Sequence, residues 1–418
     1  MRKGYETMRC GLLGEHLGHS FSPRIHGELA DYSYDIVELP PEAVGEFVKS
    51  GGYDAFNVTI PYKKAVMPFL DRISPEAAAI GAVNTVVRRP DGTLDGYNTD
   101  YFGFDAMITA SGIDVKGAKA LVLGNGGASV TVCAVLRDRG AREILVFDLK
   151  GANSYDTLPL HADADIIVNA TPVGMYPKNG VSLADLSLFP RCRGVLDLVY
   201  NPSRTALILD AEARGIPCRS GLYMLVAQAA KALEFFTGEA AEEGAIEAIT
   251  AKIAADTQNL ILIGMPGCGK STIGKLVAQR LERPFHDADE VFTDTYGKTP
   301  AQVIEAEGEE QFRRMEHDVL CELGKLSGAV ISCGGGVVTR EENYTPLHQN
   351  GVLIYLRREL SRLATGGRPL SQRTSPEALY EARRASYERF ADLTVDSTEM
   401  MDRTTDAMIA AYAEYMKG

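Results

Sequence analysis

The segment Gly264–Ser271 reads Gly-Met-Pro-Gly-Cys-Gly-Lys-Ser and fits the pattern GxxxxGK[ST] at every fixed position. An apolar run, Leu260–Ile263, precedes it, and a helical pattern, Lys270–Leu281, follows. Such a turn suits phosphate, because its glycines let backbone N–H groups approach the oxygens and the helix N-terminus adds partial positive charge. The segment therefore predicts a nucleotide site, with a chance glycine turn as the alternative. Its predicted contacts are Gly264, Gly267, Gly269, Lys270, Ser271 and Thr272.

Two of these residues carry side-chain chemistry. Lys270 is expected to reach the outer phosphates of ATP, and the Ser271 hydroxyl is expected to be a ligand of Mg²⁺. Downstream, Asp287 and Asp289 follow a predicted strand end. In an extended segment, carboxylates at i and i+2 project to the same side. One could hold the magnesium shell while the other takes a proton from a hydroxyl, so the sequence predicts phosphoryl transfer to an alcohol.

Three more motifs follow this phosphate loop: Gly308–Arg314, Cys333–Gly336 behind an apolar strand at 329–332, and Gly367–Leu370. In this order they resemble shikimate kinase, over about residues 258–398. The resemblance implies that Asp289 orients and deprotonates the shikimate hydroxyl and that Asp287 holds the magnesium shell. It also implies that Arg313 and Arg383 bind the substrate carboxylate and that Gly334, Gly335 and Gly336 let the backbone approach the substrate ring. Arg368, in the lid, would neutralise charge on the transferred phosphoryl group.

The chain departs from this family at two places. The lid segment at 361–368 is short, with no arginine that would cover adenine. Arg383 is assigned by its spacing to Tyr387, although Arg384 is adjacent and Ala385-Ser386 stands where Pro-Leu is usual.

An earlier glycine turn, Gly124-Asn-Gly-Gly-Ala-Ser129, is a relative of GxGxxG in which serine replaces the last glycine. The predicted strand Ala120–Leu123 precedes it and the predicted helix Ser129–Arg139 follows. This context favours a dinucleotide pyrophosphate site over an ordinary strand–helix turn. The residues predicted to contact the dinucleotide there are Gly124, Gly126, Gly127, Ala128 and Ser129.

Four segments before the dinucleotide turn are rich in short polar side chains and contain a lysine and an aspartate that could supply a proton. They are Gly18–Pro23, Asn57–Lys63, Gly81–Thr85 and Asn98–Asp100. Hydroxyl and amide groups suit a ring acid with several hydroxyls, and a Lys–Asp pair can supply the proton that reduction of a carbonyl needs. A lone lysine would usually lie at the surface, and serines before a proline often cap a helix.

Together with Ala170–Pro172 and Gly221–Ala230, these segments resemble shikimate dehydrogenase, from about residue 10 to 255. The resemblance implies that Lys63 protonates the carbonyl oxygen and that Asp100 holds both the lysine and a ring hydroxyl. It also implies that Ser20, Ser22 and Tyr200 bind the substrate carboxylate and that Thr59, Asn84 and Gln228 bind ring hydroxyls. Gly221 and Met224 would lie near the nicotinamide.

The choice of nicotinamide cofactor stays open in the sequence. The family generally uses NADP, with an Asn-Arg-Thr-like segment after the second strand of the nucleotide lobe. Here Asp148-Leu149-Lys150 follows the predicted strand Ile144–Phe147. An acid at such a strand end hydrogen-bonds an unphosphorylated ribose, so Asp148 makes NAD(H) possible. The family resemblance favours NADP(H) instead, and Lys150 is the one nearby cation that could bind its extra phosphate. The segment Gly151–Ala164 connects this strand to the next predicted one, and it is too short to hold a full βα repeat.

The elements around these residues alternate between strands and helices, as in α/β folds with mainly parallel sheets. We expect a two-lobed α/β unit like shikimate dehydrogenase over residues 1–257, with a truncated Rossmann-type lobe. Residues 1–103 and 222–257 would form its substrate lobe and 104–221 its dinucleotide lobe. A P-loop α/β domain like the nucleoside-monophosphate kinases would follow over 258–418, joined closely after a helix at 240–255 by residues 256–259.

The composition narrows the function classes. The 418 residues carry a formal net charge of −13, with 45% hydrophobic and 24% charged residues. This balance predicts a globular protein and argues against general binding to nucleic acid or anionic membrane. Seven unpatterned cysteines and no long apolar stretch favour a reduced, cytoplasmic protein.

The whole chain thus predicts a bifunctional enzyme that reduces 3-dehydroshikimate and then phosphorylates shikimate. Two alternatives stay open: a quinate/shikimate oxidoreductase in the first half, or one half reduced to a binding or regulatory module. The oligomeric state cannot be read from the sequence.

Overall fold

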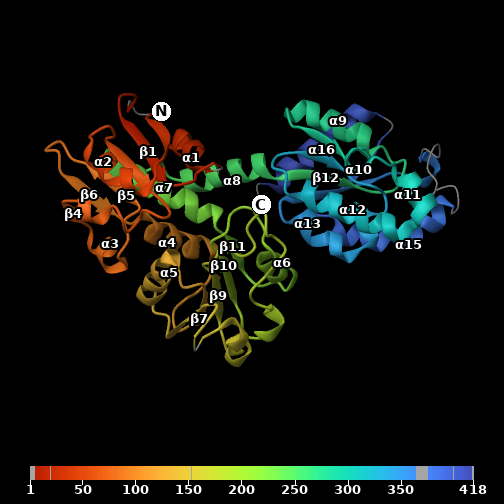
Figure 1. The fold of residues 1–418 in the computed structure, drawn as a ribbon. Coiled ribbons are helices and arrows are strands. Elements are labelled where there is room, and N and C mark those ends of the chain that lie inside the picture. The colour runs from red at the N-terminus through yellow and green to blue at the C-terminus, as the bar shows by residue number, and fades with distance from the viewer. Residues whose placement is uncertain (1–4, 19, 152, 364–374, 399, 417–418) are drawn as a thin grey trace. The chain divides into compact units, whose positions relative to one another are not determined.

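The computed structural model describes residues 5–18, 20–151, 153–363, 375–398 and 400–416 (Figure 1). The chain divides into two compact units. The first comprises Met1–Val173, Ser182–Tyr200 and Asp210–Thr250, and the second comprises Gly174–Val181, Asn201–Leu209 and Ala251–Gly418.

The first sheet of the first unit has six strands in the order β2-β1-β3-β5-β6-β4. Strands β1, β2 and β3 run parallel, whereas β5 is antiparallel to both β3 and β6. The strands are β1 (Arg9–Gly14), β2 (Ser33–Glu38), β3 (Ala55–Val58), β4 (Arg72–Ile73), β5 (Thr85–Arg88) and β6 (Leu94–Tyr97). The accompanying helices are α1 (Ser22–Leu29), α2 (Val44–Lys49), α3 (Pro75–Ile80), α4 (Thr99–Ser111) and α7 (Leu222–Thr237).

The second sheet is parallel, in the order β11-β10-β9-β7-β8. Strand β8 is therefore an edge, and the following strand β9 pairs on the other side of β7, which confirms the predicted loss of one βα repeat. The strands are β7 (Lys119–Leu123), β8 (Glu143–Phe147), β9 (Ile166–Asn169), β10 (Gly194–Asp197) and β11 (Cys218–Ser220). The helices are α5 (Gly127–Asp138), α6 (Ala206–Ala213) and, between β8 and β9, the 3₁₀ helix η3 (Tyr155–His161).

The sheet of the second unit is parallel as well, in the order β13-β14-β12-β15-β16. Its strands are β12 (Asn259–Ile263), β13 (Phe285–Asp287), β14 (Val330–Ser332), β15 (Gly351–Arg357) and β16 (Leu393–Asp396). Its helices are α9 (Lys270–Leu281), α10 (Ala288–Tyr296), α11 (Pro300–Glu307), α12 (Glu309–Gly324), α13 (Tyr344–His348), α15 (Pro376–Phe390) and α16 (Met401–Tyr415), and α8 (Ala245–Thr257) enters it from the first unit.

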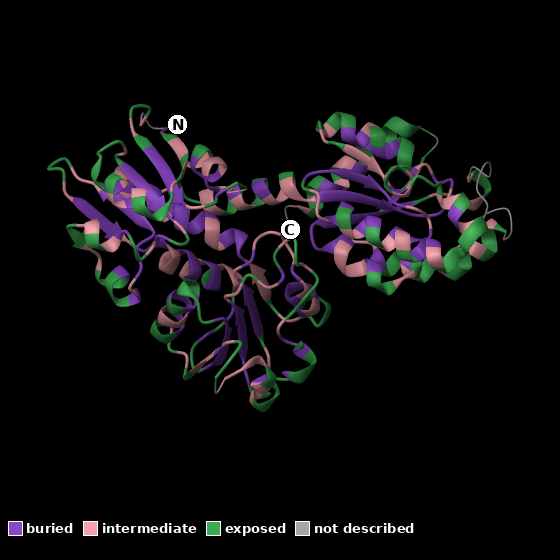
Figure 2. Ribbon diagram, in the orientation of Figure 1, coloured by how far each residue is buried: buried purple, intermediate pink, exposed green. Residues whose placement is uncertain are grey.

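The central strands of all three sheets are buried (Figure 2). Each of the five described hydrophobic clusters has members from only one side of residue 257. Because each side of the chain removes its own apolar surface from water, neither needs the other to form a core.

Three expected elements differ from the structure. The helix expected at 240–255 is α8 and begins only at Ala245, because Gly244 has a left-handed φ of +76° that stops a regular helix there. The linker expected at 256–259 is reduced to Gln258, since α8 continues to Thr257 and β12 begins at Asn259. Helix α4 also crosses the lobe boundary expected after residue 103.

The end of α8 belongs to the second unit and is hydrogen-bonded to other residues of that unit. The Ala255 carbonyl accepts hydrogen bonds from Tyr412 at 2.7 Å and from Arg283 at 2.5 Å, and the Thr257 carbonyl accepts one from the Gly328 amide at 2.8 Å. The expected boundary between 257 and 258 stays a prediction, and these bonds favour a start of the kinase-like domain at Ala251.

We predict that fragments 1–257 and 258–418 each fold alone, and that fragment 251–418 is more stable than 258–418. The shorter fragment leaves Tyr412 and Gly328 without these acceptors and removes one of the two carbonyls that bind Arg283, which should lower its free energy of unfolding by about 2 kcal/mol. Urea titrations followed by circular dichroism measure both. Equal midpoints for the two kinase fragments would contradict the role given to the end of α8.

Candidate active sites

The first site centres on an ion pair between Lys63 and Asp100. The lysine lies in the turn after β3 and the aspartate in the first turn of α4, where the helix N-terminus favours negative charge. Lys63 Nζ donates a hydrogen bond to Asp100 Oδ2 at 2.6 Å, and the two side chains are 30% and 18% exposed. This pair is half-open to a ligand, as a group that delivers a proton must be.

Asn84 sits in a buried polar network with a fixed polarity. Its Oδ1 accepts hydrogen bonds from the Thr99 amide at 2.7 Å, the Thr99 hydroxyl at 3.2 Å and the Thr85 hydroxyl at 3.0 Å. The Thr99 hydroxyl also lies 3.0 Å from Gln228 Oε1. With its oxygen engaged in this way, Asn84 presents its amide N–H groups as donors. Thr85 and Thr99 were not expected to be site residues, although both stand inside motifs that the sequence singled out.

A second arm of the network reaches the two serines at the start of α1. The Ser22 side chain hydrogen-bonds that of Tyr34, and the Tyr34 hydroxyl donates to Asn57 Oδ1 at 2.7 Å. Asn57 Nδ2 in turn donates to Thr85 Oγ1 at 3.0 Å. Burial raises the pKa of Tyr34, so its hydroxyl stays a neutral donor.

The remaining predicted substrate residues lie around these two arms. Ser20 Oγ accepts from the Ser22 amide at 3.2 Å, but the N-cap of α1 is Phe21 and has no side-chain capping bond, so the structure does not support a capping role for either serine. The ring of Phe21, between them, lies 5.5 Å from that of Tyr200. The Thr59 amide bonds to the end of β1 at Leu13. Asn84 and Gln228 therefore share one hydrogen-bonded network through Thr99, while Thr59 and Tyr200 are placed by a backbone bond and a ring contact alone.

The tyrosine arm ends at a neutral histidine. The His26 ring stacks on Tyr34 at 3.9 Å between ring centroids, and its Nδ1 lies 2.6 Å from the Tyr32 hydroxyl. Complete burial lowers the pKa of His26 to about 3, so it carries no charge at neutral pH.

The dinucleotide turn has the geometry that its glycines require. Gly124 has a φ of +105°, and a Cβ there would lie 2.6 Å from Thr171 Cγ2. Gly126 caps α5, which begins at Gly127, two residues earlier than expected, so the peptide N–H groups of Gly127, Ala128 and Ser129 stand at the helix start. A helix N-terminus of this kind can hold a pyrophosphate.

Gly221, which the sequence predicts to lie near the nicotinamide, is another point where two backbone segments approach closely. A Cβ on Gly221 would lie 2.1 Å from the Leu198 carbonyl oxygen, so only glycine fits there. Three residues on, the Met224 carbonyl oxygen would lie 2.7 Å from a Cβ on Gly103, which holds α7 against α4. Gly221 and Met224 therefore occupy the start of α7 where it meets the catalytic helix.

Asp148 lies at the end of the edge strand, next to this turn. The Gly124 amide donates to the Phe147 carbonyl at 2.8 Å, so the residue after Phe147 is close to the first glycine. Asp148 Oδ1 accepts from the Leu149 amide at 2.7 Å, and the Asp148 amide donates to the Asn153 carbonyl at 3.1 Å. This short loop closes on itself and leaves Leu149 79% exposed.

The second site begins at the phosphate loop. Gly264, Gly267 and Gly269 have φ values of +146°, +83° and +99°, all in the region that favours glycine. The Lys270 ammonium donates to the carbonyl oxygens of Gly264 at 2.9 Å and Met265 at 3.1 Å and is therefore held over the loop. Lys270, Ser271 and Thr272 form the first turn of α9.

Oxygen groups suited to magnesium converge beside the loop. The Ser271 hydroxyl donates to Asp287 Oδ2 at 2.5 Å and lies 3.3 Å from the Ser332 hydroxyl. The described residues contain no cluster of three or more His, Cys, Asp or Glu side chains. This donor set fits Mg²⁺, which commonly combines one or two protein oxygens with substrate phosphates.

The extended geometry expected for Asp287 and Asp289 is wrong. Asp287 ends β13 and caps α10, with its Oδ1 accepting from the Asp289 amide at 3.1 Å, and Asp289 lies in the first helical turn. The capping bond is stronger than the tendency to continue the strand. Both carboxylates nevertheless line one cavity, of about 160 Å³, with Lys270, Ser271 and the glycines Gly334, Gly335 and Gly336.

The two expected carboxylate-binding arginines line the same cavity. Arg313 bonds Glu316 at 2.7 Å, and its buried Nε has no partner among the described residues. Arg383 donates to the Gly335 carbonyl at 3.0 Å. Burial raises the pKa of Glu316, while Arg313 opposes that shift. Glu316 was missed in the sequence; its signal was its position three residues after Arg313. Arg368 lies outside the described residues.

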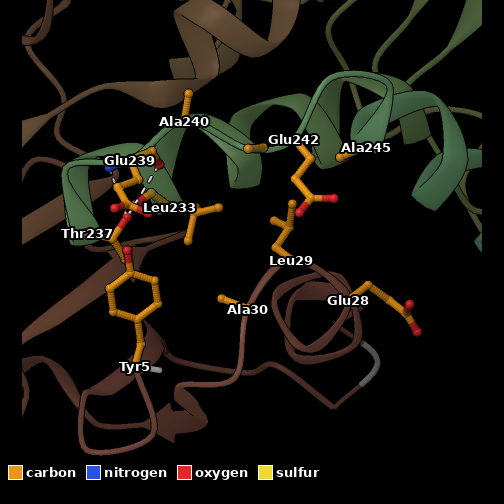
Figure 3. Close-up of a pocket in the computed structure, with 11 residues that line it drawn as sticks. Tyr5, Glu28, Leu29, Ala30, Leu233, Thr237, Glu239, Ala240, Glu242 and Ala245 are labelled. Atoms are coloured by element: carbon orange, nitrogen blue, oxygen red, sulfur yellow. Dashed lines mark hydrogen bonds between the residues drawn. The ribbon is translucent and has the colours of Figure 1, made fainter. Parts of the chain in front are cut away.

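Another cavity, of about 190 Å³, lies in the first unit between α1 and the end of α7 (Figure 3). Its described lining includes Glu28, Glu239 and Glu242 but no lysine or arginine. It contains none of the predicted site residues and lacks a cation for an acidic substrate, so we assign it no part in the chemistry.

Comparison with known proteins separates the two parts of the chain. Residues 12–86 match the shikimate dehydrogenase substrate binding domain, and residues 266–413 match shikimate kinase. A shikimate dehydrogenase (NADP(+)) of Halothermothrix orenii is 41% identical, across 56% of this chain and 91% of the relative.

Two solved structures resemble the first part. One is a chorismate mutase/shikimate 5-dehydrogenase fusion protein from Clostridium acetobutylicum (37% identity, TM-score 0.56, 58% of this chain and 96% of that one). The other is shikimate 5-dehydrogenase from Listeria monocytogenes in complex with shikimate and NAD (29% identity, TM-score 0.53, 59% and 97%).

The two folds and their sites define a bifunctional enzyme, an oxidoreductase followed by a phosphotransferase. The chain belongs to the shikimate dehydrogenase family and continues in a shikimate kinase domain. None of its described helices is long and apolar enough to cross a membrane.

We predict that Tyr34→Phe weakens binding of the acid substrate. The change removes the donor to Asn57 and the partner of Ser22, so it should cost about 1–3 kcal/mol of stability and raise KM more than it lowers kcat. Steady-state kinetics and thermal unfolding measure the two effects.

Tyr32→Phe is the matched control, because it removes a buried hydroxyl that bonds only the far side of His26. It should destabilise the protein comparably and leave KM near its original value. An equal rise of KM in both variants would reduce the network to a purely structural role.

Proposed function

We propose that this chain catalyses two consecutive steps: reduction of 3-dehydroshikimate to shikimate with a nicotinamide cofactor, then phosphorylation of shikimate to shikimate 3-phosphate with ATP and Mg²⁺. The observation that carries the proposal is the 2.6 Å pair of Lys63 and Asp100 beside an asparagine oriented as a donor. The shikimate kinase domain in the second half supports shikimate as both the product of the first reaction and the substrate of the second.

In the reduction, the bound nicotinamide supplies a hydride to the ring carbonyl. Lys63 delivers the proton to the carbonyl oxygen, and Asp100 holds the lysine in position through their hydrogen bond. Asn84 and Gln228 are placed to bind ring hydroxyls, together with Thr59. Ser20, Ser22 and Tyr200 would hold the carboxylate through hydroxyl donors.

In the phosphorylation, Asp289 accepts the proton of the shikimate hydroxyl as it attacks the terminal phosphate. Ser271 and Asp287 would hold Mg²⁺, which would supply positive charge against the phosphates, and Lys270 would add a second cation. Arg313 and Arg383 bind the substrate carboxylate, since guanidinium groups pair well with carboxylates. Arg368 is proposed to neutralise the transferred phosphoryl group.

For the cofactor we propose weak discrimination between NADP and NAD. The family relation favours NADP. Asp148, next to the dinucleotide turn, would repel a ribose phosphate and bond an unphosphorylated ribose. Lys150 is the nearby cation, and an ammonium offers less to phosphate than a bidentate guanidinium. No cysteine that the structure describes forms a disulfide, which supports a reducing, cytoplasmic location.

The rival functions have less support. A binding or regulatory module would not need a proton donor, and two observations support catalysis instead: the Lys63–Asp100 pair in the first half and the cavity that Lys270 and Asp289 line in the second. The two hydroxyls of Ser20 and Ser22 favour shikimate over quinate as the substrate of the first half.

We predict independent inactivation of the two sites. Lys63→Ala should reduce the dehydrogenase rate by about 10²–10⁴-fold, and Asp289→Ala should do the same to the kinase rate, because each removes a general acid or base. In each variant the other activity serves as the internal control. Loss of both activities in a well-folded variant would contradict two separate sites.

We also predict a low preference for NADPH over NADH in kcat/KM. Asp148→Asn should move this ratio toward NADPH by about fivefold, since it removes roughly 1 kcal/mol of repulsion between solvated charges. Asp156→Asn, in the exposed start of η3, is the control. A strong preference for NADPH in the unchanged enzyme would refute this reading of the pocket.

A further inference from the structure

Arg358 is a half-buried arginine at the carboxyl end of β15. Strand β15 pairs in parallel with β12, with Tyr355 opposite Ile263, so both strands end at the same edge of the sheet. The phosphate loop begins one residue after Ile263. Arg358 therefore leaves the sheet beside the nucleotide loop, although it stands almost ninety residues further along the chain.

Two close approaches fix this neighbourhood. A Cβ on Gly264, the first glycine of the loop, would lie 2.6 Å from the Leu356 carbonyl oxygen. A Cβ on Gly269, the last glycine, would lie 3.6 Å from Arg358 Nη1. Gly269 caps the 12-residue helix α9, so the Arg358 guanidinium lies next to the N–H groups that the loop offers to phosphate.

Arg358 has no hydrogen-bond or ion-pair partner among the residues that the structure describes, in contrast to the cations around it. Arg357 forms two bonds to Asp396, at 2.6 and 2.9 Å, and Arg362 pairs with Glu359 at 3.0 Å. Since the whole chain has a net charge of −13, carboxylates are plentiful. A half-buried guanidinium that none of them neutralises is suited to an anionic ligand.

The cavity that Asp289 and Arg383 line, where the phosphoryl acceptor is proposed to bind, indicates that Arg358 does not contact the acceptor. Lys270, Asp289 and Arg383 line that cavity, and Arg358 is absent from its described lining. Arg358 is therefore placed to meet the part of the nucleotide that stays behind, and the transferred phosphoryl group lies toward the cavity.

We propose that Arg358 binds the phosphate chain of the nucleotide within its ADP portion. The proposal rests on the kinase function proposed above. Because ADP and ATP share this portion, Arg358 contributes equally to both and acts on nucleotide affinity, with little effect on the chemical step.

The test is Arg358→Ala in the full chain. We expect the Kd for ADP, measured by titration calorimetry with Mg²⁺, and the KM for ATP to rise by the same factor, about tenfold to a hundredfold for a charge-assisted contact. The kcat should change by less than about threefold, and Arg358→Lys should restore part of the affinity. Inhibition by tripolyphosphate should weaken in parallel, and binding of adenosine should not.

Arg357→Ala is the matched control, since it removes the neighbouring charge from the same strand end and should leave the Kd for ADP unchanged. An unchanged Kd in Arg358→Ala, an equal loss in Arg357→Ala, or a loss seen with adenosine but not tripolyphosphate would each overturn the proposal. Binding of ADP needs no acceptor, so a wild-type chain that binds ADP but fails to phosphorylate shikimate would count against the proposed function alone.

Discussion

Anion binding by an acidic chain is the constraint on which both halves depend. A molecule with a net charge of −13 cannot attract a carboxylic acid, a dinucleotide and ATP through its overall field. It must create positive potential locally. The helix N-termini of α5 and α9 do so with backbone N–H groups, and neither helix has a side-chain cap or an acidic residue in its first turn.

The charged side chains that complete these sites are held by carboxylates. Lys63 lies on Asp100, and Arg313 lies on Glu316. Pairing orients each cation and offsets part of the desolvation penalty that an isolated charge would pay there. Under the proposed function, a substrate carboxylate would share the guanidinium of Arg313 with Glu316.

Much of this could be predicted from the sequence, because short motifs carry their own geometry. The glycine turns at 124 and 264 lie between a strand and a helix as expected, since positive φ values and close backbone contacts demand glycine at those positions. The polar network could not be predicted. Tyr34, Asn57 and Thr85 come from three different strands, and the register of the sheet alone brings them together. Asp287 was misjudged because capping of α10 depends on where β13 ends.

The missing βα repeat connects fold and cofactor choice. With β8 as an edge, no further strand stands beyond Asp148 to carry a loop over the adenosine ribose. The chain instead closes the short segment from Asp148 to Ser154 on itself, through the Asp148 amide and the Asn153 carbonyl. This closure pairs backbone groups that an exposed edge would leave open. Against the Asn-Arg-Thr-like segment that the family resemblance leads us to expect, Asp148 stands at the asparagine position and Leu149 at the arginine position. The truncated sheet and the altered cofactor contact therefore meet in one loop, since the loop that ends the edge strand is also the one expected to meet the ribose.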